Sequence, residues 1–221
     1  MNSANNFVLE NKTIELKKYL IEAYRLLINA YNFLISKIKD FSEYDENKLR
    51  DKLVKKAKKI KNSLYFFWNT EHPNLEKDNR IDIALVHPYS FWPENRNKII
   101  EIECKIISSS KKSHSTAKYI DTKKSFDWWK WTNWIMSFIT WKYSEKMYFW
   151  GMIWFLKEWQ IEEKIKKVKN RLIKSTDIKT IQNLEYFEVE KDFKYSYLSK
   201  HKRVKWLGNI DIYHLFFDFT K

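Results

Sequence analysis

Two short segments of the chain combine Ile and Val with regularly placed charged residues. They cover residues 80–86 and 98–107 and are separated by a polar stretch that contains two prolines. This pattern predicts two buried strands joined by a loop. Side chains two positions apart on a strand share a face. The charged residues of the second strand therefore lie together on one face: Glu101, Glu103 and Lys105.

Apolar residues recur at spacings of three and four from residue 11 to residue 38, which predicts a long amphipathic helix. A second helix is predicted over residues 45–63, and one face of it is almost solid lysine. We interpret that face as solvated, with phosphate contact as the alternative. Residues 1–10 are expected to form a disordered lead. A strongly charged helix is predicted over residues 161–173.

Shorter apolar runs predict the remaining elements. They indicate a helix over 135–143 and strands over 64–68, 147–156, 184–190, 194–199 and 210–219. With two Gly and three Pro in 221 residues, no linker is visible, and the length fits one domain. We therefore expect an α/β (α+β) chain with a central mixed sheet flanked by helices. Residues 1–63 would form an N-terminal helical extension packed on a core of residues 64–221.

Carboxylates on the two neighbouring strands predict a metal site. Asp82 lies in the middle of the first strand, and Glu103 and Lys105 lie on the second. Hydrolysis of a phosphodiester commonly uses a divalent cation that is held by oxygen ligands and bridges the phosphate. Asp82 and Glu103 are the predicted ligands, with the carbonyl of Cys104 as a further oxygen. Lys105 is predicted to orient water or to stabilise charge on the phosphoryl oxygens, with Glu101 as an auxiliary acid.

This arrangement of an acid followed by an acid-x-Lys motif resembles the PD-(D/E)xK nuclease superfamily, the fold of many restriction endonucleases. Asp82 matches the first acid, Glu103 the second and Lys105 the lysine. Ile81 stands where the family often has a Pro. The resemblance implies a restriction-endonuclease-like fold and a Mg²⁺- or Mn²⁺-dependent endonuclease that hydrolyses DNA phosphodiester bonds. Many relatives work as dimers, so the resemblance also implies a homodimer as a candidate assembly.

The same resemblance implies that a helix before the first core strand can lend a further carboxylate to the site. The candidates are Glu22, Asp45 and Glu46.

Two other interpretations compete with a metal site and a nuclease. Glu101, Glu103 and Lys105 also fit the solvated face of an edge strand. A metal site is favoured because like charges on one face of a strand repel unless a cation lies between them. An unpaired carboxylate in the apolar segment around Asp82 is costly as well. The alternative function is a catalytically inactive protein of the same fold that binds nucleic acid or another partner.

The net charge of +14 favours a polyanion partner, either nucleic acid or an anionic membrane surface. A basic, Ser-rich segment after residue 107 is predicted to be a loop beside the site whose lysines clamp a DNA backbone. A second basic cluster follows residue 200, where a phosphate contact and a plain surface histidine both fit His201. The predicted nucleic-acid contacts are Lys111, Lys112, Lys118, His201 and Arg203.

Neither a secretory signal nor a membrane span is visible in the sequence. Residues 1–10 are mostly polar, and no stretch of eighteen apolar residues occurs. The single cysteine, Cys104, excludes an internal disulfide framework and a cysteine-based zinc site. We therefore expect a cytoplasmic protein without a membrane partner.

Gly occurs 2 times and Trp 11 times, whereas average usage predicts roughly 15 Gly in a chain of this length. Many of the tryptophans lie between residues 128 and 159. We hypothesise that most come from UGA codons that the source organism reads as Gly; the alternative is a genuine Trp-rich surface that stacks on bases or touches a membrane. With Trp taken as Gly, the segments at 141–144 and 151–154 resemble those of a group of bacterial restriction-endonuclease-like proteins. That resemblance covers residues 78–219.

Overall fold

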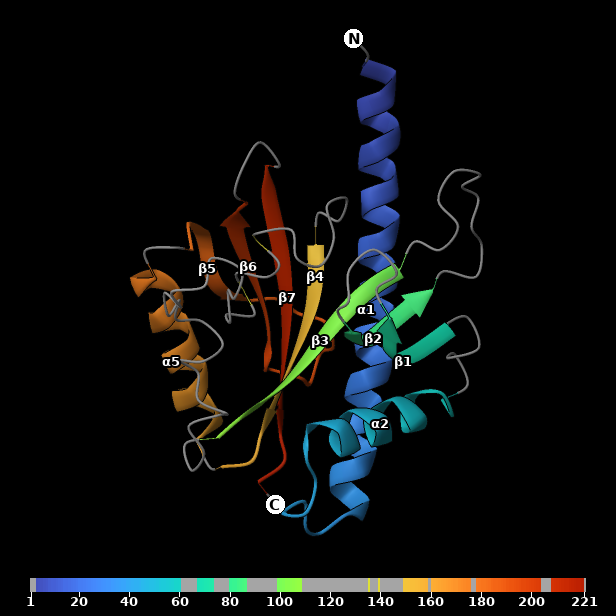
Figure 1. The fold of residues 1–221 in the computed structure, drawn as a ribbon, viewed down its shortest axis with the longest axis vertical. Coiled ribbons are helices and arrows are strands. Elements are labelled where there is room, and N and C mark those ends of the chain that lie inside the picture. Colours follow the sequence, from blue (N-terminus) through green and yellow to red (C-terminus); the bar gives the residue numbers. More distant parts are fainter. Residues whose placement is uncertain are drawn as a thin grey trace.

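The chain forms an α+β fold around one mixed sheet. A computed structural model describes residues 3–60, 67–73, 80–86, 99–108, 149–158, 160–175, 178–203 and 208–220, together with positions 135 and 139. Seven strands form the sheet in the order β1-β2-β3-β4-β7-β6-β5 (Figure 1). They are Phe67–Pro73 (β1), Arg80–Val86 (β2), Ile99–Ile107 (β3), Phe149–Leu156 (β4), Thr180–Tyr186 (β5), Ser196–Lys202 (β6) and Asn209–Asp218 (β7).

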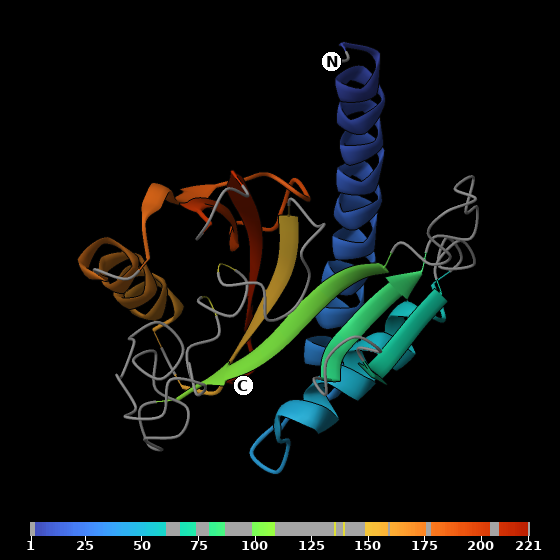
Figure 2. The same ribbon diagram turned by 45° about the horizontal axis from the view of Figure 1, so that its top comes forward.

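The three central strands, β3, β4 and β7, run parallel, and the other neighbouring pairs are antiparallel. Helices cover both faces of the sheet. Helices α1 (Ser3–Lys37) and α2 (Glu46–Ala57) share one apolar core with β2, β3, β4 and β7, and α5 (Ile161–Lys174) lies in the second core on the opposite face. Figure 2 shows α1 and α2 on one side of the molecule and α5 on the other.

The strands predicted over 64–68 and 184–190 differ from the structure in their bounds. Strand β1 covers Phe67–Pro73 rather than residues 64–68. Pro73 fits there because β1 is an edge strand and Pro73 is its last residue, where the missing N–H breaks little of the ladder. Strand β5 ends at Tyr186 rather than residue 190, and its pairing with β6 is interrupted by register shifts.

The predicted disordered lead is wrong, because α1 begins at Ser3 and continues without a break through Asn11 and Thr13. Helix α2 ends at Ala57 and is shorter than predicted. Of the predicted helix over 135–143, only Ile135 and Ile139 belong to the described residues, and both are helical and buried.

A tyrosine hydroxyl fixes α1 against the middle of the sheet. Tyr24 Oη donates a hydrogen bond to the carbonyl of Tyr213 at 2.8 Å and accepts one from the N–H of Met152 at 2.9 Å. The hydroxyl reaches the backbone because Gly151 has no side chain. A Cβ at Gly151 would lie 2.7 Å from Tyr24 Oη and 2.7 Å from Ile102 Cγ1. This glycine therefore serves a close approach between helix and strand.

Candidate functional site

Strands β2 and β3 diverge at the position of Asp82, and side chains complete the hydrogen bonding that the ladder leaves open. The ladder between β2 and β3 begins with the pair Val86 and Ile99 and ends with the pair Ile83 and Ile102. Beyond it, the N–H of Cys104 donates to Asp82 Oδ2 at 2.8 Å. Two residues further on, the N–H of Ile106 donates to Glu46 Oε2 at 3.0 Å. Two carboxylates therefore stand in for a neighbouring strand along this part of β3.

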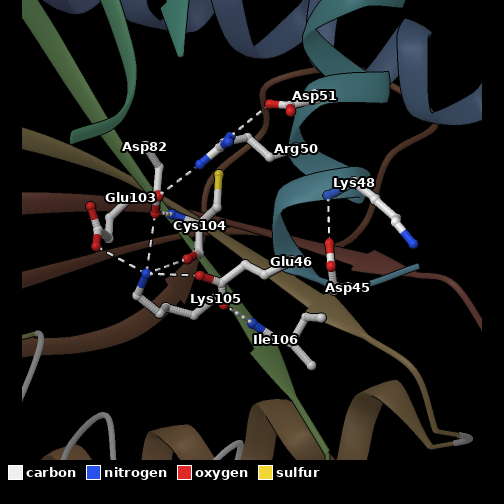
Figure 3. Close-up of polar contacts among 10 residues, drawn as sticks. All are labelled: Asp45, Glu46, Lys48, Arg50, Asp51, Asp82, Glu103, Cys104, Lys105 and Ile106. Carbon is white, nitrogen blue, oxygen red and sulfur yellow. Dashed lines mark hydrogen bonds and ion pairs between the residues drawn. The ribbon is translucent and has the colours of Figure 1, made fainter. Parts of the chain in front are cut away.

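The ammonium of Lys105 lies at the point where the carboxylates converge (Figure 3). Its Nζ is 3.0 Å from Glu103 Oε1, 3.1 Å from Asp82 Oδ2 and 3.2 Å from Glu46 Oε1. The same nitrogen donates to the carbonyl oxygen of Cys104 at 2.6 Å. Oxygens from α2, β2 and β3 thus surround one cation.

Burial makes the charges in this cluster depend on one another. Glu103 is 2% exposed, and burial, offset in part by Lys105, raises the pKa of its carboxyl from 4.5 to about 8. Burial alone would lower the pKa of Lys105, but the surrounding carboxylates outweigh it and hold that pKa above the usual value. Lys105 is therefore charged, and the Glu103 carboxyl takes up a proton more readily than an exposed glutamate does.

One oxygen of the cluster is left over. Within the described residues, the buried Oε2 of Glu103 has no hydrogen-bond partner. An unsatisfied buried carboxylate oxygen is costly, so this atom marks a position where a further donor or a cation would be stabilising.

The first two turns of α2 supply the helical side of the cluster. Asp45 caps the helix by accepting from the N–H of Lys48 at 2.7 Å, which leaves the next residue, Glu46, to reach β3. One turn later the buried guanidinium of Arg50 lies 3.3 Å from Asp82 Oδ1 and 3.0 Å from Asp51 Oδ1. Arg50 therefore fixes the orientation of the Asp82 carboxylate from behind.

The donor set fits a hard divalent cation in its chemistry. Among the described residues, Lys105 Nζ contacts three carboxylate oxygens and one carbonyl oxygen, and oxygens are the ligands that Mg²⁺ and Mn²⁺ prefer. In the described part of the chain, no group of three His, Cys, Asp or Glu side chains is already arranged to hold a metal. The ammonium takes the central position, so a metal there requires Lys105 to withdraw.

The structure brings together the three residues predicted to carry the chemistry: Asp82, Glu103 and Lys105. Glu101 lies one strand repeat before Glu103 on the same face and is 8% exposed. Of the three candidate helix carboxylates, Glu46 joins the cluster, whereas Asp45 is a helix cap and Glu22 pairs with Arg25.

The predicted nucleic-acid contacts divide into two groups. Lys111, Lys112 and Lys118 lie outside the described residues. His201 is fully buried, with hydrogen bonds to Thr180 and Ser199, and Arg203 is 4% exposed. Neither side chain therefore lies on the surface in this structure, and the phosphate contact at these two positions stays a prediction. His214, on β7, is also fully buried and hydrogen-bonded to Ser199.

Arg50 was missed in the sequence. The available signal was its spacing of four from Glu46, which places both on one side of α2. It is also an arginine in a helix whose other basic residues are lysines, and arginine is favoured where a buried carboxylate must be held.

Trp150 and Trp154 occupy positions where the core accommodates an indole rather than a glycine. Trp154 is fully buried, donates from Nε1 to His214 Nδ1 at 3.1 Å and stacks on Phe216 with ring centroids 5.8 Å apart. Trp150 is 1% exposed in the same core. In the described part of the chain the only non-glycine residue with positive φ is Gln160. At 150 and 154 the packing favours tryptophan, against our expectation; the tryptophans at 128–141 and at 159 lie outside the described residues.

Comparison with known proteins leaves the cluster to be interpreted from its own geometry. No family model, no curated protein and no solved structure matches the chain. None of the described helices is both long enough and apolar enough to cross a membrane.

Proposed function

We propose that this protein is a metal-dependent endonuclease with a restriction-endonuclease-like fold that hydrolyses DNA phosphodiester bonds. The observation that carries the proposal is the convergence of three carboxylates, from α2, β2 and β3, on a single cation position. The mixed sheet flanked by helices, with the acids on adjacent strands, supports it.

Each residue has a distinct role in the proposed reaction. Asp82, Glu103 and Glu46 would hold Mg²⁺ or Mn²⁺, with the Cys104 carbonyl as a further ligand. The bound ion would polarise a phosphoryl oxygen and acidify a water. Lys105, once withdrawn from the carboxylates, would place its ammonium against the phosphate and the attacking water. Glu101 is the auxiliary acid.

The energetic argument concerns the charge of the cluster. Carboxylates that are mostly buried and close together raise one another's pKa and destabilise the fold unless a cation neutralises them. Lys105 and Arg50 supply two positive charges against the three carboxylates of Glu46, Asp82 and Glu103. The cluster therefore retains affinity for a further positive charge.

Cleavage of supercoiled plasmid in Mn²⁺ or Mg²⁺, with EDTA as the negative control, tests the proposal. Asp82→Asn should lower the rate by about a hundredfold or more, since it removes a metal ligand without changing shape. Asp211→Asn is the matched control, because Asp211 is an ion-paired carboxylate of similar exposure, 15% against 16% for Asp82. Equal rates for the two variants, or cleavage that persists in EDTA, would rule out the proposed site.

The second candidate function is a nucleic-acid-binding or partner-binding protein of the same fold without catalysis. It is favoured by one observation, namely that Lys105 already contacts all three carboxylates and so neutralises part of their charge. Calorimetric titration with Mn²⁺ separates the two functions. Binding that Asp82→Asn abolishes supports the nuclease, and the absence of binding in the wild type supports the second candidate.

A further inference from the structure

Four lysines form a ridge along the solvent side of α2. The residues are Lys48, Lys52, Lys55 and Lys59, spaced four, three and four apart, so they share one side of the helix and its final turn. All four are exposed. The opposite side of α2 is buried in the core through Leu49, Leu53 and Ala57, which holds the ridge toward solvent.

Within the described residues, no acidic side chain forms an ion pair with any of these four lysines. The acids of the same segment are engaged elsewhere: Asp45 caps the helix, Glu46 faces Lys105 and Asp51 pairs with Arg50. Helix α5 has a similar lysine content but a different arrangement, because Lys164 pairs with Glu158 and Lys167 with Glu163.

The ridge is unfavourable for the isolated helix. Like charges three or four residues apart on a helix repel by about 0.2–0.5 kcal/mol per pair. The helix dipole compensates the lysines near the C-terminal end, but it opposes Lys48, which lies in the first turn. A partner that brings negative charge along the whole ridge would relieve this repulsion.

The position of the ridge selects the partner. The same helix places Glu46 in the carboxylate cluster, whereas Lys48, two residues further on, projects from the other side of the helix into solvent (Figure 3). From Lys48 to Lys55 the helix rises by about 10 Å, the axial length of about three phosphates of one DNA strand. A membrane surface fits less well, because none of the exposed large hydrophobic residues among those described lies on α2.

We propose that the lysine ridge of α2 binds the phosphate backbone of duplex DNA. This inference rests on the proposed nuclease function for its choice of substrate. It assigns the polyanion contact to the outer face of α2 rather than to the buried His201 and Arg203.

Binding can be measured apart from cleavage by fluorescence anisotropy of a labelled DNA duplex in EDTA. The variant Lys48→Gln/Lys52→Gln/Lys55→Gln removes three charges from the ridge. Lys166→Gln/Lys169→Gln/Lys174→Gln removes the same charge from exposed positions of α5 on the opposite face and serves as the matched control. Each lost phosphate contact lowers the slope of log K against log salt by about 0.9, so the α2 variant should bind on the order of a hundredfold more weakly at 0.1 M salt. The α5 variant should bind almost as the wild type does.

Several results would overturn the ridge proposal. Equal losses in the two variants would mean that only net charge matters. An unchanged DNA affinity in the α2 variant, including one accompanied by lost binding to phosphatidylserine vesicles, would also overturn it. Cleavage assays in Mn²⁺ are a separate measurement. If the ridge binds DNA but the protein does not cleave it, the ridge proposal stands and the nuclease proposal fails. If the protein cleaves DNA but the α2 variant keeps the wild-type salt slope, the nuclease proposal stands and the ridge proposal fails.

A second measurement does not depend on the stability of the triple variant. Lys52→Cys and Lys169→Cys can each carry a thiol-linked photo-crosslinker, since the native thiol, Cys104, is buried and protected from labelling. Crosslinks to duplex DNA from position 52 and not from position 169 would support the ridge, and the opposite pattern would contradict it.

Discussion

At the residue scale, Lys105 has two roles that compete, as the counter-charge of the carboxylates and as the proposed catalytic lysine. In the structure its ammonium lies within 3.2 Å of oxygens from Glu46, Asp82 and Glu103 and holds these carboxylates together. In the proposed nuclease a metal ion takes that position and Lys105 moves toward the phosphate. Two cations cannot share one point, so metal affinity and the stability of the metal-free cluster are expected to oppose each other.

Lys105→Met tests this competition, because methionine fills a similar volume without the charge. Without metal, the variant should lose about 3–5 kcal/mol of stability, since Glu46 and Glu103 lose their counter-charge and Asp82 keeps only Arg50. Mn²⁺ should bind it more tightly than the wild type and raise its melting temperature by more, while plasmid cleavage is lost. Titration calorimetry and thermal unfolding with and without Mn²⁺ measure both effects. A weaker Mn²⁺ affinity in the variant would show that Lys105 supports the metal site rather than competing for it.

A substitution at Trp154 distinguishes a genuine tryptophan from a UGA codon that the source organism reads as Gly. If the indole is native, Trp154→Gly should destabilise the protein by about 3–5 kcal/mol through the cavity it leaves. The loss of the hydrogen bond to His214 adds to that cost. If the source organism inserts Gly here, the substitution restores the native residue and should raise the melting temperature instead. Denaturant unfolding of the two proteins decides the sign.

At the element scale, α2 has two adjacent acids at its start with different tasks. Asp45 accepts from the N–H of Lys48 and caps the helix, whereas Glu46 binds the N–H of Ile106 and the ammonium of Lys105. The pair therefore distinguishes an effect on the helix from an effect on the cluster.

Asp45→Ala should cost about 1 kcal/mol of stability through the lost cap and leave Mn²⁺ affinity nearly unchanged. Glu46→Ala should lower Mn²⁺ affinity by on the order of tenfold or more, as the loss of a side chain that contacts the site does. Calorimetry and urea unfolding of both variants provide the comparison. Equal Mn²⁺ affinities would place Glu46 outside the metal site.

The sequence predicted elements well where the hydrophobic period was long or the alternation strict. The spacing over 161–173 gave α5 almost to the residue, and the alternation at 98–107 gave β3. It failed where tertiary contacts decide the bounds. Strand β1 is held by pairing with β2 rather than by its own composition, and α1 continues through polar residues up to Ser3.

The same limit applies to the site. Glu103 and Lys105 could be predicted because strand alternation places them on one face, and Asp82 because it is a carboxylate in the middle of the neighbouring apolar strand. Glu46 remained one of three candidates, because its role depends on where α2 lies relative to β3, a long-range contact that local patterns do not encode. His201 looked like a surface residue beside lysines, yet pairing of β6 with both β5 and β7 buries it.

At the scale of the whole molecule, a chain of hydrogen bonds crosses the core from β4 through β7 and β6 to β5. The indole N–H of Trp154 donates to His214 Nδ1 at 3.1 Å. An indole nitrogen only donates, so Nδ1 of His214 is the acceptor and the ring proton is on Nε2. His214 Nε2–H therefore donates a hydrogen bond to Ser199 Oγ at 2.8 Å. Ser199 then donates to His201 Nε2 at 2.8 Å.

The chain ends on the helix that covers this face. His201 Nδ1 donates to Thr180 Oγ1 at 3.2 Å, and Thr180 donates to the carbonyl of Leu172 on α5 at 3.1 Å. Every donor in the series meets an acceptor, so both histidines are neutral in one fixed tautomer. Protonation of either ring would place a donor against a donor.

This chain predicts that the protein loses stability in mild acid. Burial lowers the pKa of His201 from 6.5 to about 4 and, together with the neighbouring His201, that of His214 to about 3, while Asp211 slightly offsets the effect on His201. Between pH 6.5 and about 4 the two histidines therefore bind protons in the unfolded chain but not in the folded protein. The free energy of unfolding should fall with decreasing pH by about 1.4 kcal/mol per pH unit for each histidine, or about 2.8 kcal/mol per pH unit for the pair.

Urea unfolding of the wild type and of His201→Gln/His214→Gln from pH 7 to pH 4.5 measures this slope, and the variant corrects for the carboxylates that titrate in the same range. The double variant should be less stable at pH 7 but clearly flatter with pH; parallel curves for the two proteins would mean that the histidines are not held neutral in the core.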